Sequence, residues 1–178
     1  MQFVDFLRIQ GAPQDTLLKS NKKVHGLVAD YSHCGQIIKL LLPQTYMNQS
    51  GLSIVAAMRC FNLNPDQILL VHDELDLAPG TARIKYDGGH GGHNGLRDIF
   101  QASGRRDFYR LRIGIGHPGD KSKVLNFVLK PAGTMEQQWI HEAMYKASQA
   151  PLDALIQGKY AQAMQILHQQ STNHSKTQ

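Results

Sequence analysis

The chain has 178 residues, of which 42% are apolar and 19% are charged. Its length is close to that of one domain, and its apolar content is too high for an intrinsically disordered chain. No apolar run approaches the roughly 18 residues of a membrane span, and residues 1–10 lack the features of a signal peptide. Two cysteines, Cys34 and Cys60, are too few for a disulfide scaffold and are typical of reduced thiols in a cytosolic protein.

The positive charge is concentrated in one part of the chain. The net charge is +5, but residues 83–130 contain ten Lys or Arg and only four Asp, which is +6, and the rest sums to −1. A basic segment on a nearly neutral body favours a phosphate-rich partner. A solvated basic face would have the same composition, so charge alone does not decide between the two.

The first half of the chain predicts a helix, a hairpin and a second helix. Apolar residues within 1–10 have mostly helical spacing, without a capping residue before them. Residues 24–31 and 36–42 predict two strands joined by a tight turn. Residues 50–61 place Ile54, Met58 and Phe61 on one helical stripe, with Asn48 and Ser50 where the cap should be.

The second half predicts alternating strands and helices, then helices only. Residues 68–71, 81–86 and 109–115 predict strands, and a glycine-rich stretch at 88–95 precedes a helix at 96–103. From residue 134 on, an apolar helical stripe begins at Trp139 and continues to Leu167. The prediction is one α/β domain over residues 1–170, with a mixed twisted sheet flanked by helices and a helical C-terminus, followed by a polar tail at 171–178.

The segment at 44–51 lies between a strand end and a helix start. A helix N-terminus offers free N–H groups to an anion or a carbonyl oxygen. Asn48 adds two amide donors and an acceptor, and Tyr46 offers a flat ring for a base or a peptide. Capping by Asn48 and packing by Tyr46 would explain the same residues without any function.

The segment at 72–76, His-Asp-Glu-Leu-Asp, follows directly on a predicted buried strand. Ligands of open α/β sheets bind outside the carboxyl ends of strands. Asp73 is the first carboxylate there, and a carboxylate at such a place can fix the tautomer of a general-base histidine. An acidic turn is the plain alternative, and a metal site at His72, Asp73 and Asp76 is a further, weaker one.

The segment at 88–95, Gly-Gly-His-Gly-Gly-His-Asn-Gly, opens into a helix. Its five glycines permit close approach of a ligand to the backbone. The pattern is neither a Walker A loop nor a dinucleotide fingerprint. His90 and His93 are weak metal-ligand candidates, and Asn94 could cap the helix or bind substrate.

Together these segments resemble bacterial peptidyl-tRNA hydrolase. The resemblance extends over nearly the whole chain and is carried by the motifs at 43–51 (Pro-Gln-Thr-Tyr-Met-Asn-Gln-Ser-Gly), 72–76, 88–95, 110–119 (Arg-Leu-Arg-Ile-Gly-Ile-Gly-His-Pro-Gly) and 128–129. It implies hydrolysis of the ester between a peptide and the terminal ribose of tRNA, which recycles tRNA from abortive translation. It implies no metal and no organic cofactor. The implied partner is peptidyl-tRNA, not a membrane, and we expect a cytoplasmic monomer.

The resemblance also assigns residues. Asp73 would hold the catalytic histidine in its basic form. Asn48 and Asn94 would place the attacking water and the substrate, and Tyr46 would line the site for the tRNA end and the peptide. The phosphate of tRNA would be held by basic residues: Lys85 and Arg112, with His93 nearby and Lys121 extending the path.

One departure from the family concerns the catalytic histidine. The family begins with an inner strand, a loop and an Arg-His-Asn segment that carries this histidine, and by alignment these would precede Met1. None of the nine histidines matches it by motif. Three hypotheses follow. The sequence is a truncated or mis-started active hydrolase, which we favour, or a non-catalytic RNA-binding relative, as organellar splicing factors of this family suggest. The third is a metal-dependent hydrolase using His72, Asp73 and His90.

Overall fold

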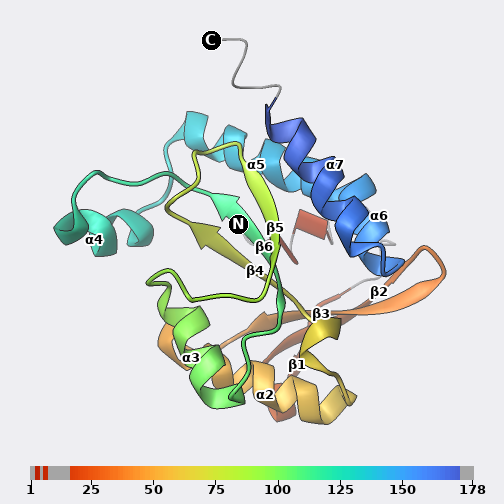
Figure 1. Ribbon diagram of the computed structural model, residues 1–178. Coiled ribbons are helices and arrows are strands. Elements are labelled where there is room, and N and C mark those ends of the chain that lie inside the picture. The colour runs from red at the N-terminus through yellow and green to blue at the C-terminus, as the bar shows by residue number, and fades with distance from the viewer. Residues whose placement is uncertain (1–2, 5, 8–16, 173–178) are drawn as a thin grey trace. The chain divides into compact units, whose positions relative to one another are not determined.

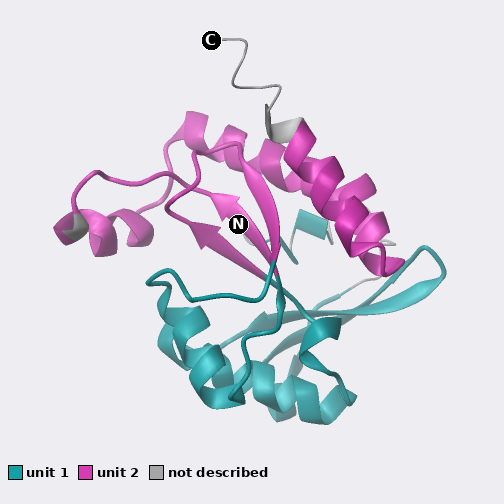
Figure 2. Cartoon of the chain, viewed as in Figure 1, with its two compact units in different colours: residues 1–70, 86–109 teal, residues 71–85, 110–178 magenta. Residues whose placement is uncertain are grey.

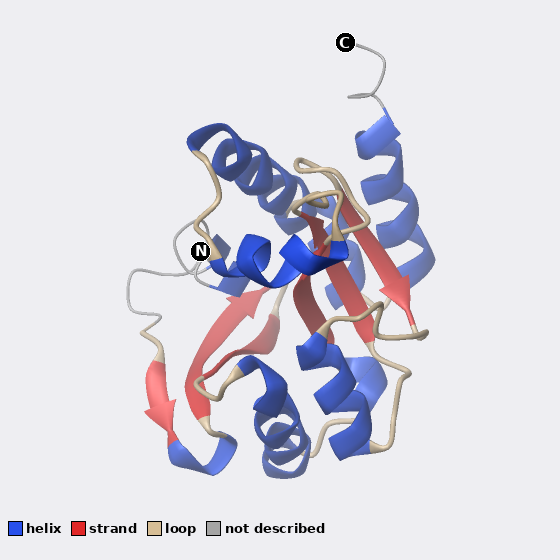
Figure 3. Cartoon of the chain, turned by 90° about the vertical axis from the view of Figure 1, so that its left-hand side faces the viewer, coloured by secondary structure: helices blue, strands red, loops and turns tan. Residues whose placement is uncertain are grey.

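The computed structural model describes residues 3–4, 6–7 and 17–172, apart from the side chains of Lys121 and the residues from Gln170 on. The chain divides into two compact units (Figure 2). Unit 1 comprises residues 1–70 and 86–109, and unit 2 comprises residues 71–85 and 110–178. The α/β class with a helical C-terminus is confirmed (Figures 1 and 3).

An antiparallel sheet of three strands belongs to unit 1. It consists of β1 (Lys19–Asn21), β2 (Gly26–His33) and β3 (Gln36–Pro43), in that order. The predicted hairpin is therefore confirmed. His33 pairs with Gln36, and Cys34 and Gly35 between them both have positive φ, at 49° and 74°. Two central residues with positive φ make a turn whose twist matches that of the strands. The short strand β1 was not predicted.

The helices of unit 1 enclose its core. They are the 3₁₀ turns η1 (Lys22–Val24), η2 (Met47–Gln49) and η3 (Pro65–Gln67), and the α-helices α2 (Ser50–Phe61) and α3 (Asn94–Ser103). The predicted helix at 50–61 is confirmed at both ends. Buried side chains of α2 and α3 form this core together with Leu70 and Phe108. Its members are Ile54, Leu70, Leu96, Ile99, Phe100 and Phe108. Of the helix expected at 1–10, residues 3–4 and 6–7 are helical, and the remainder lies outside the described residues.

The second sheet has the order β4-β6-β5, with β4 (Leu69–Glu74), β5 (Ala82–Tyr86) and β6 (Tyr109–Gly114). One mixed sheet was predicted, but the described strands form two separate sheets of three. In this strand order, β3 and β4 are both edge strands, and they are not hydrogen-bonded to each other. β4 also runs three residues further than predicted, through Glu74.

Helices complete unit 2. They are η4 (Lys121–Lys123), α4 (Val124–Leu129), α5 (Thr134–Ser148), α6 (Ala150–Ile156) and α7 (Tyr160–Thr172), and α5, α6 and α7 pack on one another (Figure 1). Met144, Leu152 and Leu167 of the predicted stripe are buried. Trp139 was placed in that stripe wrongly, since its side chain is 40% exposed. In the described residues, no helix has the length and apolar character needed to cross a membrane.

Candidate functional site

The turn η2 holds Asn48 at the surface of unit 1. Asn48 is exposed, and Gln49 rather than Asn48 or Ser50 occupies the N-cap position of α2. No side-chain hydrogen bond caps α2 from that position, and the hydroxyl of Ser50 instead donates to the carbonyl of Met47 at 2.8 Å. The predicted cap is therefore wrong, because η2 turns the chain before α2 begins. Asn48 is thus exposed, and so is Tyr46 two residues before it, at 79%.

The start of α3 presents Asn94 in a similar way. His93 is the N-cap of this helix, and its Nδ1 accepts a hydrogen bond from the backbone N–H of Leu96 at 3.2 Å. An accepting Nδ1 places the proton of the neutral ring on Nε2, which is then a donor. Because His93 caps the helix, Asn94 is not needed for capping. Asn94 is exposed, and its Oδ1 accepts from Nη1 of Arg97 at 3.3 Å.

These two segments are neighbours within unit 1. A Cβ built on Gly95 would lie 2.6 Å from Sδ of Met47, so the start of α3 touches η2 directly. Asn48 follows Met47 and Asn94 precedes Gly95. Unit 1 therefore places the segments that carry these two asparagines, which are 46 residues apart in the sequence, next to each other.

In unit 2, the segment predicted to follow a strand is part of the strand. His72, Asp73 and Glu74 are the last three residues of β4, and all are half-buried. Nδ1 of His72 lies 2.7 Å from the carbonyl oxygen of Asp73, so the ring donates to the backbone there. In the described part of the chain, His72, Asp73 and Asp76 do not bring three ligand atoms together as a metal site would. His90 belongs to unit 1, whereas His72 and Asp73 belong to unit 2.

Glu74, which the sequence did not single out, pairs with one of the predicted site residues. Its Oε2 accepts from Nε of Arg112 at 2.9 Å, and the side chains of Glu74 and Arg112 are 13% and 24% exposed. Burial by itself raises the pKa of Glu74. The hydrogen bond from Arg112, the N–H of Asp76 and the positive charges of Arg112 and His72 outweigh burial and hold the pKa below its usual value. Only the pairing of two strands could have revealed this partner.

The basic segment is less exposed than its composition suggests. Arg110 was counted among its charges, but Arg110 is only 3% exposed. Lys85 on β5 is exposed, and Arg112 lies on β6, the middle strand of the same sheet. Lys121 begins η4. The +6 charge therefore includes at least one residue that a partner could not touch.

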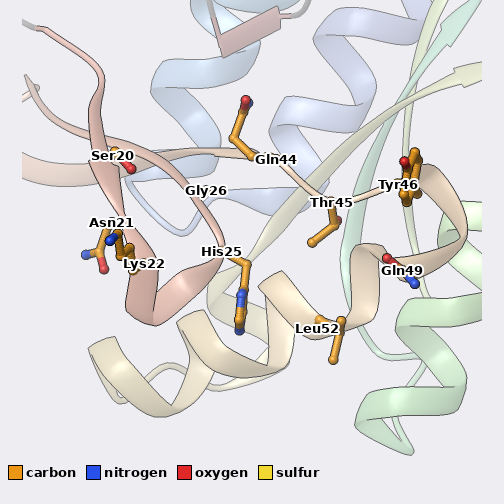
Figure 4. A pocket seen from close by; sticks show the side chains of 10 residues that line it. All are labelled: Ser20, Asn21, Lys22, His25, Gly26, Gln44, Thr45, Tyr46, Gln49 and Leu52. Carbon is orange, nitrogen blue, oxygen red and sulfur yellow. The ribbon is translucent and has the colours of Figure 1, made fainter.

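A cavity of about 740 Å³ opens in unit 1 beside η2 (Figure 4). Its lining comes from β1, η1, the start of β2, the loop after β3, η2 and the start of α2: Ser20, Asn21, Lys22, His25, Gly26, Gln44, Thr45, Tyr46, Gln49 and Leu52. The hydroxyl of Thr45 is buried there, and among the described residues it has no hydrogen-bond partner. Tyr46 thus borders both the cavity and the surface that carries Asn48.

Comparisons with known proteins agree with the motifs. A family model described as peptidyl-tRNA hydrolase matches residues 4–176. The peptidyl-tRNA hydrolase of Pseudomonas putida is 47% identical over 166 residues, which is 93% of this chain and 85% of that protein. The enzyme of Azotobacter vinelandii is 51% identical over 152 residues, or 85% and 78% of the two chains. The crystal structure of peptidyl-tRNA hydrolase from Acinetobacter baumannii matches with a TM-score of 0.86 at 43% identity, over 93% of this chain and 82% of that one.

Proposed function

Because the chain belongs to the peptidyl-tRNA hydrolase family, we propose that it hydrolyses the ester that joins a peptide to the terminal ribose of tRNA. Water attacks the ester carbonyl carbon, the bond to the ribose oxygen breaks, and that oxygen takes up a proton. The products are a peptide with a free carboxylate and a tRNA with a free terminal hydroxyl. The family predicted from the motifs is confirmed, and membership favours an enzyme over a non-catalytic RNA-binding relative.

The observation that carries the proposed mechanism is the pair of exposed asparagines in unit 1. Asn48 and Asn94 stand on adjoining segments, each with a side-chain amide at the surface. An amide can donate to the developing oxyanion and accept from a water molecule. We assign to both the placement of the attacking water and of the substrate carbonyl. The exposed ring of Tyr46 provides a face for the tRNA end or the peptide.

Asp73 has a different role in this proposal. It orients a general-base histidine and stabilises the imidazolium that forms when this base takes a proton from water. No histidine of the 178-residue sequence stands in an Arg-His-Asn segment, where the family carries its base. A hydrolase needs such a base, whereas a protein that only binds RNA does not. The identity of the base therefore distinguishes the two hypotheses.

The tRNA backbone is held by charge in this proposal. Lys85 and Arg112 contact phosphate from one sheet of unit 2, His93 donates through Nε2 from unit 1, and Lys121 extends the contact. Contacts to phosphate give affinity and position without reading sequence. Such an enzyme acts on many tRNAs, as the recycling of abortive products requires. We further propose that it works as a monomer in the cytoplasm.

The proposed function is tested with the protein purified from the cell that makes it. Its intact mass is measured, because 178 residues correspond to 19.9 kDa, and it is assayed with peptidyl-tRNA labelled in the peptide. Catalytic release of the free peptide acid and intact tRNA supports the proposal. Stable binding of tRNA without release, at a mass of 19.9 kDa, contradicts it and supports the RNA-binding alternative. Light scattering during gel filtration gives the molar mass in solution and so tests whether the protein is a monomer.

A further inference from the structure

We propose that Asp98 is a positioning residue that fixes Asn48 and Asn94 relative to each other. Asp98 lies on α3, and its carboxylate Oδ2 accepts a hydrogen bond from the backbone N–H of Gly51 at 2.7 Å. Gly51 is the second residue of α2. The geometric part of this inference stands on unit 1 alone, and its consequence for catalysis rests on the proposed function.

The bond to Gly51 replaces a cap that α2 lacks. The first N–H groups of a helix have no partner within the helix. Gln49, at the N-cap position of α2, makes no side-chain hydrogen bond to them. Asp98 supplies the missing acceptor from a helix 47 residues further along the chain. Its negative charge also suits the positive end of the α2 dipole, and such charge-assisted bonds are stronger than neutral ones.

Two glycines let the helices approach closely on either side of this bond. A Cβ on Gly51 would lie 2.6 Å from Cβ of Ala102 and 2.7 Å from the backbone oxygen of Asp98. A Cβ on Gly95 would lie 2.6 Å from Sδ of Met47. The contacts at Gly51 are with a backbone oxygen and a Cβ and leave no space for a methyl group, so α2 and α3 fit together in one register there. The contact at Gly95 is with the flexible side chain of Met47.

The hydrogen bond is close to both asparagines along the chain. Gly51 is three residues after Asn48, and Asp98 is four residues after Asn94, one helical turn away. Asn48 lies just before α2, so a shift of α2 along α3 would move Asn48 relative to Asn94 by nearly the same distance. Since displacements of about 1 Å can cost two orders of magnitude in rate, the link has a direct catalytic consequence.

A purely structural role for Asp98 makes a different prediction, namely that any cap on α2 can replace it. The double variant Asp98→Ala/Gln49→Asp provides such a cap from the N-cap position itself. It should recover the stability lost in Asp98→Ala. It should not recover the position of Asn48, because the new cap no longer ties α2 to α3.

The experiment records the side-chain amide NMR signals of Asn48 and Asn94 in the full chain. Variants are Asp98→Ala, Asp98→Asn, the double variant, and Asp30→Ala as control, since Asp30 pairs with Lys39 on the β2–β3 hairpin, at 2.6 Å. We expect the asparagine signals to move in Asp98→Ala and to stay moved in the double variant. They should remain near the wild-type positions in Asp98→Asn, whose amide oxygen can still accept from Gly51, and in the control.

Kinetics give the second readout. We expect kcat to fall roughly ten- to hundredfold in Asp98→Ala and in the double variant, with KM changed less than about twofold and substantial recovery in Asp98→Asn. Unmoved asparagine signals in the folded double variant, or full recovery of kcat there, would overturn the positioning role. A wild-type protein that does not hydrolyse peptidyl-tRNA would defeat the proposed function instead, and the NMR comparison would still decide on Asp98.

Discussion

Nε of Arg112 donates to Oε2 of Glu74 at 2.9 Å, between β6 and β4. The arginine proposed to hold tRNA phosphate is thus already oriented by a carboxylate. A guanidinium has five N–H donors in a fixed fork, so a bond through Nε leaves the terminal nitrogens for a phosphate. Glu74 fixes the direction of that fork and lowers its net charge locally.

Removing the charge of Arg112 should change how binding depends on salt. We expect Arg112→Ala to weaken binding to all tRNAs alike and to reduce the slope of log K against log salt by about 1. Titrations at four or more salt concentrations measure this slope. Arg106→Ala is the control, because Arg106 is exposed but has no assigned role. An unchanged slope in Arg112→Ala would remove Arg112 from the phosphate contact.

Glu74 should make stability depend on pH in the acidic range. Its folded-state pKa is lower than normal, so the unfolded chain binds the proton more readily. The stabilisation by the ionised carboxylate is therefore complete above the unfolded pKa, near pH 4.5, and is lost as the pH falls through the folded pKa. Denaturant titrations of wild type and Glu74→Gln should converge on acidification from about pH 6 to 3. A constant difference in unfolding free energy over that range would contradict the account.

Asp73→Ala should separate turnover from affinity. If Asp73 orients the base, its loss lowers kcat by roughly 10²- to 10⁴-fold and changes the Kd for tRNA by less than about threefold, since a carboxylate does not attract phosphate. Single-turnover rates and tRNA binding are measured on the same preparation. Asp76→Ala, two residues past the end of β4, is the matched control. Equal losses of rate and affinity in Asp73→Ala would end its orienting role.

A methyl group added at Gly95 should displace the side chains of Met47 and His93. The added Cβ would meet Met47 at 2.6 Å and the ring of His93 at 3.0 Å. We expect Gly95→Ala to lower the free energy of unfolding by about 1–3 kcal/mol and to reduce kcat. Gly89→Ala is the control, because a Cβ there has nothing within 4 Å, and its effect should remain within about 0.5 kcal/mol. Equal melting temperatures for the two variants would show that η2 and α3 do not need this close contact.

Local patterns predicted the elements well and their ends less well. The hairpin and the helix at 50–61 follow from alternation and helical periodicity, which the structure preserves. The same periodicity predicted that Trp139 is buried, which is wrong. Periodicity shows on which face of a helix a side chain lies, but not whether neighbouring elements cover that part of the face. The strand at 68–71 was cut short because three polar residues follow Val71, and half-buried strand residues need not be apolar.

The site was predictable where its chemistry is local and unpredictable where it is not. The motifs gave Asn48 and Asn94 as candidates, and the fold brings their segments together. The cap of α2 was assigned to its neighbours in sequence, whereas its partner is Asp98, on another helix. Glu74 escaped notice for the same reason, since its partner lies on a strand 38 residues away. Partners so far apart in the sequence produce no regular spacing from which their contact could be predicted.

The proposed hydrolysis is measured as the rate at which the purified protein releases tRNA from a peptidyl-tRNA of defined sequence. We expect multiple turnovers that yield the free peptide acid and tRNA with an intact terminal ribose. We also expect Asn48→Ala and Asn94→Ala each to slow this release while tRNA is still bound. Tight binding of peptidyl-tRNA with no release above the uncatalysed rate would contradict the account and leave the chain as an RNA-binding member of its family.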